Sequence, residues 1–134
     1  MFSIVATLGI LLMDLDHVPI AAERLAKEEA SDAQLVDALK QAGDVATVVR
    51  TISAYFVGKD GPIKDLKGDV DALGWRLVSV SGPEQDGSFY LWLEREQSTS
   101  LEDLARLRSD ALKIEAHYEV KYDGWETSAE PGIN

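Results

Sequence analysis

The stretch WRLVSVSGPEQDGSFYLWLE, residues 75–94, decides the fold of this chain. Its first part is rich in β-branched residues and predicts a strand, and residues 81–87 have the composition of a loop. In residues 89–94 apolar side chains alternate with polar and aromatic ones, including Tyr90 and Trp92, which predicts a second strand with two different faces. Two strands therefore follow each other without a helix between them.

Helices and further strands flank this central pair. Apolar residues at helical spacing predict a helix that begins at Gly61-Pro62 and ends near Leu73, and residues 100–103 have the spacing of a helix cap. Residues 46–57 and 117–122 have the composition or alternation of strands, the first and the last of this part of the chain. From residue 46 the order is therefore β-α-β-β-α-β.

This order predicts an α+β fold, a ferredoxin-like split sandwich in which two helices cover one face of a four-stranded antiparallel sheet. The other face could stay open for dimerisation or partner binding, or the N-terminal apolar residues could cover it. Residues 19–30 and 31–42 predict two additional helices, the second with capping-box spacing and a stop at Gly43. We expect a single domain overall, with an apolar and helical extension at 1–30 and the α+β domain at 31–134.

Composition narrows the possible functions. The 134 residues carry a net charge of −11, which argues against direct binding to a nucleic-acid backbone and suits either solubility or a basic partner. There is no cysteine, so disulfides and thiolate metal sites are excluded, and a reducing cytoplasmic setting is expected. Residues 2–13 are uncharged but shorter than the roughly 20 residues of a membrane span, so we interpret them as a buried or interface segment.

Only weak patterns point to catalysis. Asp14 and Asp16 follow an apolar run and resemble the nucleophile motif of haloacid-dehalogenase-like phosphatases, which would make the chain a small metal-dependent hydrolase. Asp14, Asp16 and His17 could also ligate a divalent cation, but no further cluster of ligand residues accompanies them. His117 is expected on the last strand, at the surface. No phosphate-binding glycine loop or nucleophile elbow is present, so we expect no cofactor, no metal and no enzymatic activity.

The run Tyr122-Asp123-Gly124-Trp125-Glu126-Thr127 follows the alternating residues 118–122. Asp and Gly favour a turn, so this run is expected to end the last strand. It could pin the edge of the sheet, or its aromatic residues could form part of a binding surface, and both roles are compatible. Arg50, on a strand with little other charge, is expected to pair with an acidic neighbour or to mark a functional position.

These segments together resemble the RraB family, the regulators of ribonuclease activity B. The resemblance covers roughly residues 32–127, and the run at residues 122–127 is its most specific part. The other segments that carry it are the helix at 32–42 followed by Gly43-Asp44, the strand at 50–56, Gly74-Trp75, and Leu91-Trp92-Leu93-Glu94.

The resemblance implies a ferredoxin-like α+β sandwich and a non-enzymatic regulator. Such a regulator would bind and inhibit RNase E, or its degradation assembly, through protein–protein contacts. The expected partner-binding residues are Tyr122, Asp123, Trp125, Glu126 and Arg50. The alternatives are a self-associating module, or a module for an unrelated protein partner that has kept the fold.

Overall fold

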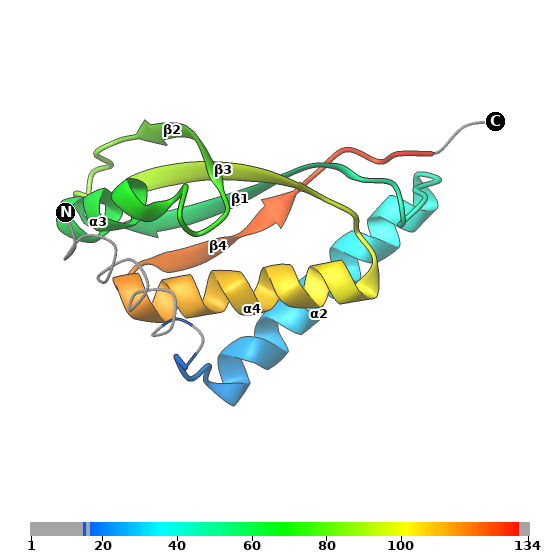
Figure 1. Cartoon of the computed structure of the whole chain (residues 1–134), viewed down its shortest axis with the longest axis horizontal. Coiled ribbons are helices and arrows are strands. Elements are labelled where there is room, and N and C mark those ends of the chain that lie inside the picture. The colour runs from blue at the N-terminus through cyan, green and yellow to red at the C-terminus, as the bar shows by residue number, and fades with distance from the viewer. Residues whose placement is uncertain (1–14, 16, 132–134) are drawn as a thin grey trace.

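The computed structural model describes residue 15 and residues 17–131 (Figure 1). Our expectations for residues 2–13, Asp14 and Asp16 lie outside this described part. Within it, no helix combines the length and the apolar character needed to cross a lipid bilayer. The elements are α2 Ala22–Gln41, β1 Arg50–Gly58, α3 Asp60–Asp69, β2 Arg76–Ser81, β3 Phe89–Gln97, α4 Leu101–Tyr118 and β4 Lys121–Glu126.

The four strands form one sheet in the order β2-β3-β1-β4, and every neighbouring pair is antiparallel. β1 and β3 form the centre, with nine paired positions from Arg50 opposite Gln97 to Gly58 opposite Phe89. Helix α3 connects β1 to β2, and α4 connects β3 to β4. This is the strand order of a ferredoxin-like sandwich, so the predicted fold class is confirmed.

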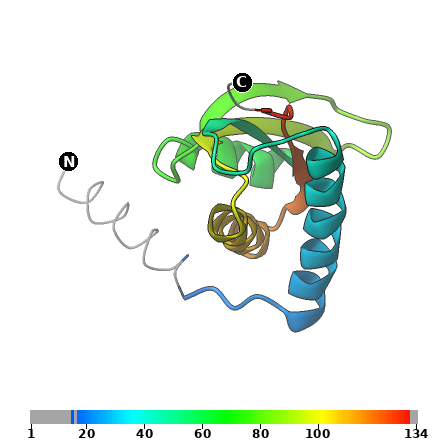
Figure 2. The ribbon, with the colours of Figure 1, turned by 90° about the vertical axis from the view of Figure 1, so that its right-hand side faces the viewer.

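The core lies between the sheet and its helices. α3 and α4 pack against one face of the sheet, while α2 stands beside α4 and β4 (Figure 2). Alternate residues of the central strands face the helices and are fully buried, as the period of two requires. Each such leucine, isoleucine or phenylalanine contributes roughly 1.5–3 kcal/mol through its burial. The fully buried residues of β1 and β3 are Ile52, Ala54, Phe56, Leu91 and Leu93.

The predicted break between two N-terminal helices at residue 31 is wrong. α2 is one continuous helix from Ala22 to Gln41, and it ends before Gly43, which has a φ of +84°. Ser31, the expected cap of the second helix, and Asp32 both lie in mid-helix, and Asp32 is 6% exposed. Its carboxylate has partners from other elements, so it does not compete for the helix backbone. The division at residue 30 into extension and domain stays a prediction, although α2 runs across it.

The last strand was predicted too early. Residues 117 and 118 form the end of α4, and Glu119 leaves the helix in the left-handed conformation with a φ of +59°. β4 then runs from Lys121 to Glu126, so the Asp-Gly pair lies inside the strand instead of ending it. The helical period of α4 continues past Ile114, because Tyr118 is buried on the same side as Ile114.

The first strand begins later than predicted, at Arg50 instead of residue 46. The guanidinium of Arg50 donates hydrogen bonds to the carbonyl oxygens of Val45 and Val48, at 2.8 and 3.0 Å. These backbone groups are therefore used in a loop and not in the sheet. The predicted cap of α4 is confirmed, because the Ser100 side chain accepts a hydrogen bond from the amide of Asp103.

Candidate protein-binding site

The motif at residues 122–127 contains a β-bulge inside β4. Phe56 of β1 lies opposite Tyr122, and Ala54 lies opposite Trp125. Between these two pairs β1 has one residue and β4 has two, so β4 carries an additional residue at this point. A bulge of this kind bends the strand and changes the direction of the side chains that follow it.

Gly124 provides the backbone conformation that the bulge requires. Its φ is +100°, which glycine adopts without the steric cost that a Cβ atom would bring. In a regular strand, residues three apart point to opposite faces. Because of the bulge, Tyr122 and Trp125 both point toward the helices, and only 2% and 8% of them is exposed.

Trp125 connects three elements through a buried carboxylate. Its indole N–H donates to Oδ1 of Asp32 on α2 at 2.8 Å, and Nη1 of Arg108 on α4 donates to Oδ2 at 2.8 Å. The indole nitrogen thus finds the acceptor that a buried tryptophan needs. Removing Asp32 would leave both donors without this partner, so the motif holds α2 and α4 in place from the end of the sheet.

At the free edge of β4, side chains from two helices form hydrogen bonds with the backbone of Tyr122. The Tyr122 amide donates to Oε1 of Glu115 at 2.8 Å, and its carbonyl oxygen accepts from Nη2 of Arg24 at 3.0 Å. Arg24 and Glu115 also form a two-point ion pair, with both N–O distances 2.8 Å. An edge strand whose backbone groups are used in this way cannot pair with another chain at that position.

Arg50 belongs to a second buried network. It forms an ion pair with Asp44, and the two side chains are 3% and 4% exposed. Asp44 also accepts hydrogen bonds from the Thr99 hydroxyl at 3.0 Å and from the Glu130 amide at 2.7 Å. Burial alone would raise the pKa of Asp44, but these hydrogen bonds and the Arg50 charge together lower it. The expected pairing of Arg50 with an acidic neighbour is confirmed.

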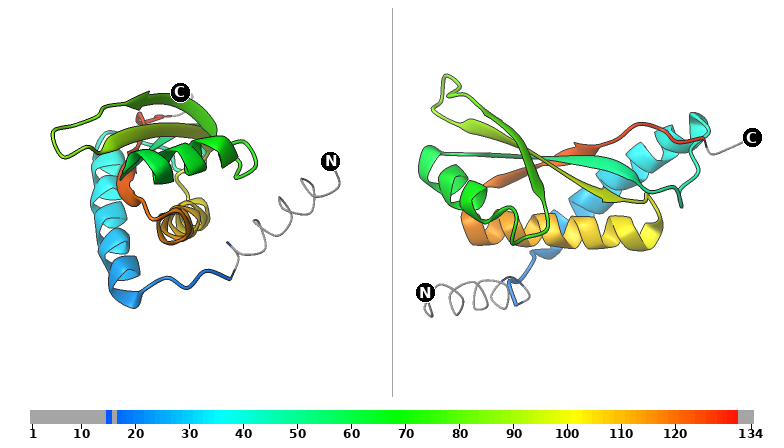
Figure 3. Two further views of the ribbon diagram at one scale, coloured as in Figure 1. Left: turned by 90° about the vertical axis from the view of Figure 1, so that its left-hand side faces the viewer. Right: turned by 45° about the horizontal axis from the view of Figure 1, so that its top comes forward.

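The opposite face of the sheet carries aromatic side chains, and none of the described helices covers it (Figure 3). Trp92 and Tyr90 on β3 are 37% and 38% exposed. The Trp92 ring lies 5.9 Å from the Tyr55 ring, centroid to centroid, and its indole N–H donates to the Ser53 hydroxyl at 3.0 Å. We call this surface, made by the outward side chains of the four strands, the open face.

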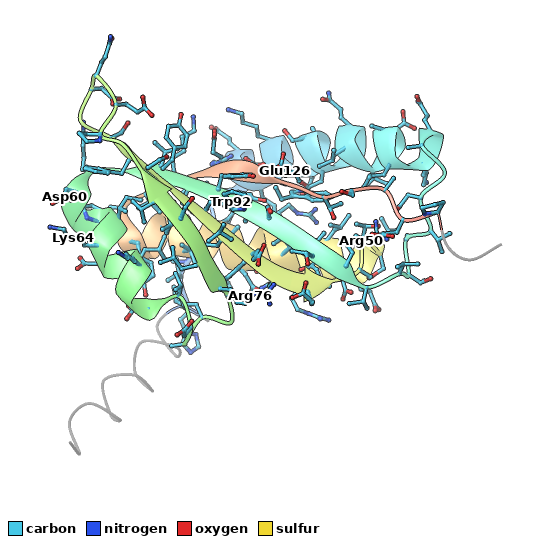
Figure 4. All side chains as sticks on the ribbon, turned by 90° about the horizontal axis from the view of Figure 1, so that it is seen from above. Arg50, Asp60, Lys64, Arg76, Trp92 and Glu126 are labelled. Carbon is cyan, nitrogen blue, oxygen red and sulfur yellow. The ribbon has the colours of Figure 1, made fainter. Side chains whose placement is uncertain are left out.

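Glu126 and Arg76 lie on opposite sides of Trp92 on the open face (Figure 4). The Tyr55 hydroxyl donates to Oε1 of Glu126 at 2.5 Å, and burial together with this hydrogen bond raises the pKa of Tyr55 to about 12. On the other side Arg76 forms ion pairs with Glu94 at 3.1 Å and with Glu96 at 2.5 Å. Tyr55 and Trp92 are therefore held in position by polar neighbours, which lowers the cost of ordering these two side chains when a partner binds.

Comparison with known protein families identifies the chain. The model of the family RraB, "Regulator of ribonuclease activity B", matches residues 29–127. The chain belongs to the RraB family. This places it among regulators of ribonuclease activity. A search of curated proteins found no match.

The five partner-binding residues predicted for this RraB protein divide between the two faces of the sheet. Tyr122, Trp125 and Arg50 are buried at 2%, 8% and 7% exposure, where they hold elements together. Asp123 and Glu126 are exposed on β4. The structure thus does not bring all five together on one surface, and Glu126 is the residue of the five that joins the aromatic cluster.

The sequence prediction missed the other residues of the open face as site residues: Ser53, Tyr55, Arg76, Tyr90, Trp92, Glu94 and Glu96. One signal for them was present, because Tyr90, Trp92 and Glu94 share the polar face of an alternating strand. Their arrangement with Tyr55 depends on the pairing of β1 with β3, where Tyr55 lies opposite Trp92. Strand pairing between distant segments cannot be read from periodicity alone.

The described part of this RraB chain shows no group of three or more metal-ligand residues. His117 is in the last turn of α4, not on a strand as predicted, and its ring lies edge-on to Tyr118 at 4.8 Å. His17 is exposed.

Proposed function

We propose that this chain regulates RNA decay by binding RNase E, or the assembly that contains it, and inhibiting the enzyme without catalysing a reaction itself. Membership of the RraB family supports the regulatory role. We also propose a cytoplasmic location, which the absence of cysteine suits. The observation that carries the proposal is the aromatic cluster of the open face.

The open face has the chemistry of an interface centre. Tryptophan and tyrosine dominate the binding energy of many protein interfaces, and here Trp92, Tyr55 and Tyr90 lie together on adjacent strands. The buried motif on the other side of β4 supports this surface, since Tyr122 and Trp125 fix the strand on which Glu126 lies. We propose that Asp123 and Glu126 contact the partner, whereas Tyr122, Trp125 and Arg50 act by positioning.

The charge of the chain favours contact with the enzyme over contact with its RNA. A net charge of −11 repels phosphate groups but attracts basic protein segments over long distances. We therefore expect binding to weaken steeply as the salt concentration rises, because the screening length falls from about 10 Å at 0.1 M to about 3 Å at 1 M.

Inhibition of purified RNase E tests the proposal. Increasing amounts of the chain are added to the enzyme and a fluorescent RNA substrate, and binding is measured in parallel by biolayer interferometry. We expect inhibition by the wild type and a loss of roughly 30-fold in affinity for Trp92→Ala, since a central aromatic residue contributes about 2 kcal/mol or more. Leu101→Ala, at an 81% exposed apolar residue on α4, is the matched control and should bind like the wild type.

Two results would contradict this function. The first is the absence of binding at low salt by a folded wild-type chain. The second is equal binding by wild type and Trp92→Ala, which would move the interface away from the open face.

Self-association through the open face is the second candidate. Trp92 and Tyr90 give this face exposed aromatic surface, at 37% and 38% exposure, that a second copy of the chain would cover. Analytical ultracentrifugation separates the two functions. A dimer that Trp92→Ala converts to a monomer, without any binding to RNase E, would favour self-association.

A further inference from the structure

A hollow on the open face lies beside the aromatic cluster, between β1 and the end of β4. It has a volume of about 430 Å³ and is lined by Thr51, Ser53, Glu126, Thr127 and Ser128. Every lining residue carries a hydroxyl or a carboxylate, and none carries a positive charge. The hollow therefore offers hydrogen-bond acceptors to a donor from outside.

Glu126 gives this hollow a negative charge that the described residues do not neutralise with an ion pair. Its Oε1 accepts from the Tyr55 hydroxyl, and no described cation lies within ion-pair distance of either oxygen. Glu96 differs, because Arg76 pairs with it and the Thr51 hydroxyl donates to it. The Glu126 carboxylate is thus available to a cation of a partner.

Two aromatic residues, Tyr55 and Trp92, are hydrogen-bonded to residues that line the hollow. Trp92 donates its indole N–H to Ser53, which lines the hollow, and Tyr55 donates to Glu126, which also lines it. A flat cation that reached Glu126 would therefore lie beside aromatic rings. The guanidinium of arginine is flat, stacks on aromatic faces and forms two parallel hydrogen bonds with a carboxylate. The ammonium of lysine stacks less well and cannot form the same pair of parallel hydrogen bonds.

The same chain already uses this combination between β3 and α4, where the side chains of Arg95 and Asp110 are 16% and 41% exposed. The guanidinium of Arg95 lies 4.3 Å from the centre of the Trp75 ring and donates to Asp110 at 3.0 Å. On the open face the rings of Trp92 and Tyr55 and the Glu126 carboxylate are present, but the described Arg76 pairs with Glu94 and Glu96, and no described arginine pairs with Glu126. We infer that the hollow beside Trp92 and Tyr55 binds an arginine side chain of the partner protein, with Glu126 as its counter-ion.

This inference rests on the proposed function, because it names the chemistry by which the open face would recognise its partner. The net charge of −11 would attract an arginine-bearing segment before contact. The hollow then selects arginine over other cations by shape.

Peptide binding to the full chain tests the inference. The probe is a nine-residue peptide of glycine and serine with arginine at three alternate positions, compared with versions that carry lysine or citrulline there. Binding is followed by two-dimensional NMR, with the Trp92 indole signal and the amides of Ser53 and Glu126 as reporters. We expect the arginine peptide to shift these signals, the lysine peptide to bind several-fold more weakly, and the neutral citrulline peptide to cause no shift.

Two variants that each remove one negative charge distinguish binding in the hollow from general charge attraction. Glu126→Gln keeps a hydrogen-bond acceptor for Tyr55. It should lower the affinity for the arginine peptide by on the order of tenfold, because the charge-assisted pair is lost. Glu102→Gln removes an exposed charge in the first turn of α4 and should leave the affinity unchanged. Equal weakening by both variants, or equal binding of the arginine and lysine peptides, would show only general charge attraction and overturn the inference.

The outcomes also separate this inference from the proposed function. If RNase E binds and Glu126→Gln leaves its affinity unchanged, the arginine site is wrong while the regulatory function stands. If the arginine peptide binds at the reporters but RNase E does not bind, the site stands and the proposed partner is wrong.

Discussion

At the scale of single residues, two buried tyrosines show how differently the same side chain can be used. The Tyr118 hydroxyl donates to Asp69 at 2.6 Å, which connects α4 to α3. The Tyr122 hydroxyl has no hydrogen-bond partner among the described residues, although the residue is only 2% exposed. Burial raises the pKa of both phenols, so both remain protonated at neutral pH.

Replacing each tyrosine with phenylalanine should therefore have opposite effects on stability. Tyr118→Phe should lower the free energy of unfolding by about 1 kcal/mol or more, because it leaves a carboxylate oxygen without its donor. Tyr122→Phe should leave it unchanged or raise it by up to about 1 kcal/mol, because an unsatisfied hydroxyl is removed from the interior. Urea unfolding measures both values, and a clear loss of stability in Tyr122→Phe would contradict this account of its hydroxyl.

At the scale of elements, β4 owes its two inward aromatic residues to the bulge at Gly124. A Cβ atom at this position would meet no heavy atom within 4 Å, so only the positive φ opposes a larger residue. Gly68 in α3 also has open space around it but has an ordinary helical setting. The two glycines therefore form a matched pair that separates backbone conformation from packing.

Alanine at these two positions should change stability in opposite directions. Gly124→Ala should lower the free energy of unfolding by about 1–2 kcal/mol, the cost of a left-handed conformation for a residue with a Cβ atom. Gly68→Ala should raise it by roughly 0.5–1 kcal/mol, the difference in helix propensity. Thermal and urea unfolding measure both effects. An unchanged stability of Gly124→Ala would mean that the bulge tolerates another backbone conformation.

At the scale of the whole molecule, the Asp44–Arg50 pair connects segments that are far apart in sequence. The loop after α2, the start of β1, Thr99 before α4 and Glu130 after β4 all bond to these two side chains. α2 is attached in the same manner by Asp32 and Arg24, whose partners lie on α4 and β4. The additional helix is thus held by buried and half-buried polar contacts as well as by packing.

The Asp44 pair should make stability depend on pH in the acid range. Because the pKa of Asp44 is lower in the folded chain than in the unfolded chain, its contribution is complete above the unfolded value of about 3.9. The contribution is lost as the pH falls through the lower folded value. Asp44→Asn should destabilise the chain by about 3–5 kcal/mol at neutral pH, because it leaves the Arg50 charge buried without its partner.

Unfolding free energies measured between pH 7 and pH 2.5 check this expectation. The difference between wild type and Asp44→Asn should shrink as the pH falls below about 4. Asp60→Asn is the control, because Asp60 pairs with Lys64 at the surface with both side chains mostly exposed, and little change is expected at any pH (Figure 4). A constant difference between wild type and Asp44→Asn across this range would contradict the assigned role of the carboxylate.

The sequence predicted local features best. Alternation in residues 89–94 predicted which side chains of β3 face the core, and the cap at Ser100 predicted the start of α4. Prediction from the sequence failed where a residue bonds to a distant partner instead of taking its usual local role. Asp32 was expected to begin a helix, but it bonds to Trp125, which is 93 positions away. Asp123 and Gly124 were expected to form a turn, but strand pairing made them a bulge.

From residue 46 onward, the sequence by itself determined the order of helices and strands and the apolar face of each, because those properties follow from spacing along one segment. It also carried residues 29–127, which the model of the RraB family matches. Only the tertiary structure decided which side chains meet. It buried Tyr122, Trp125 and Arg50, and it placed Trp92 and Tyr55 beside Glu126 on the open face. The physical reason is that these contacts join segments whose proximity depends on the pairing of β1 with β3 and β4, and no local pattern encodes that pairing.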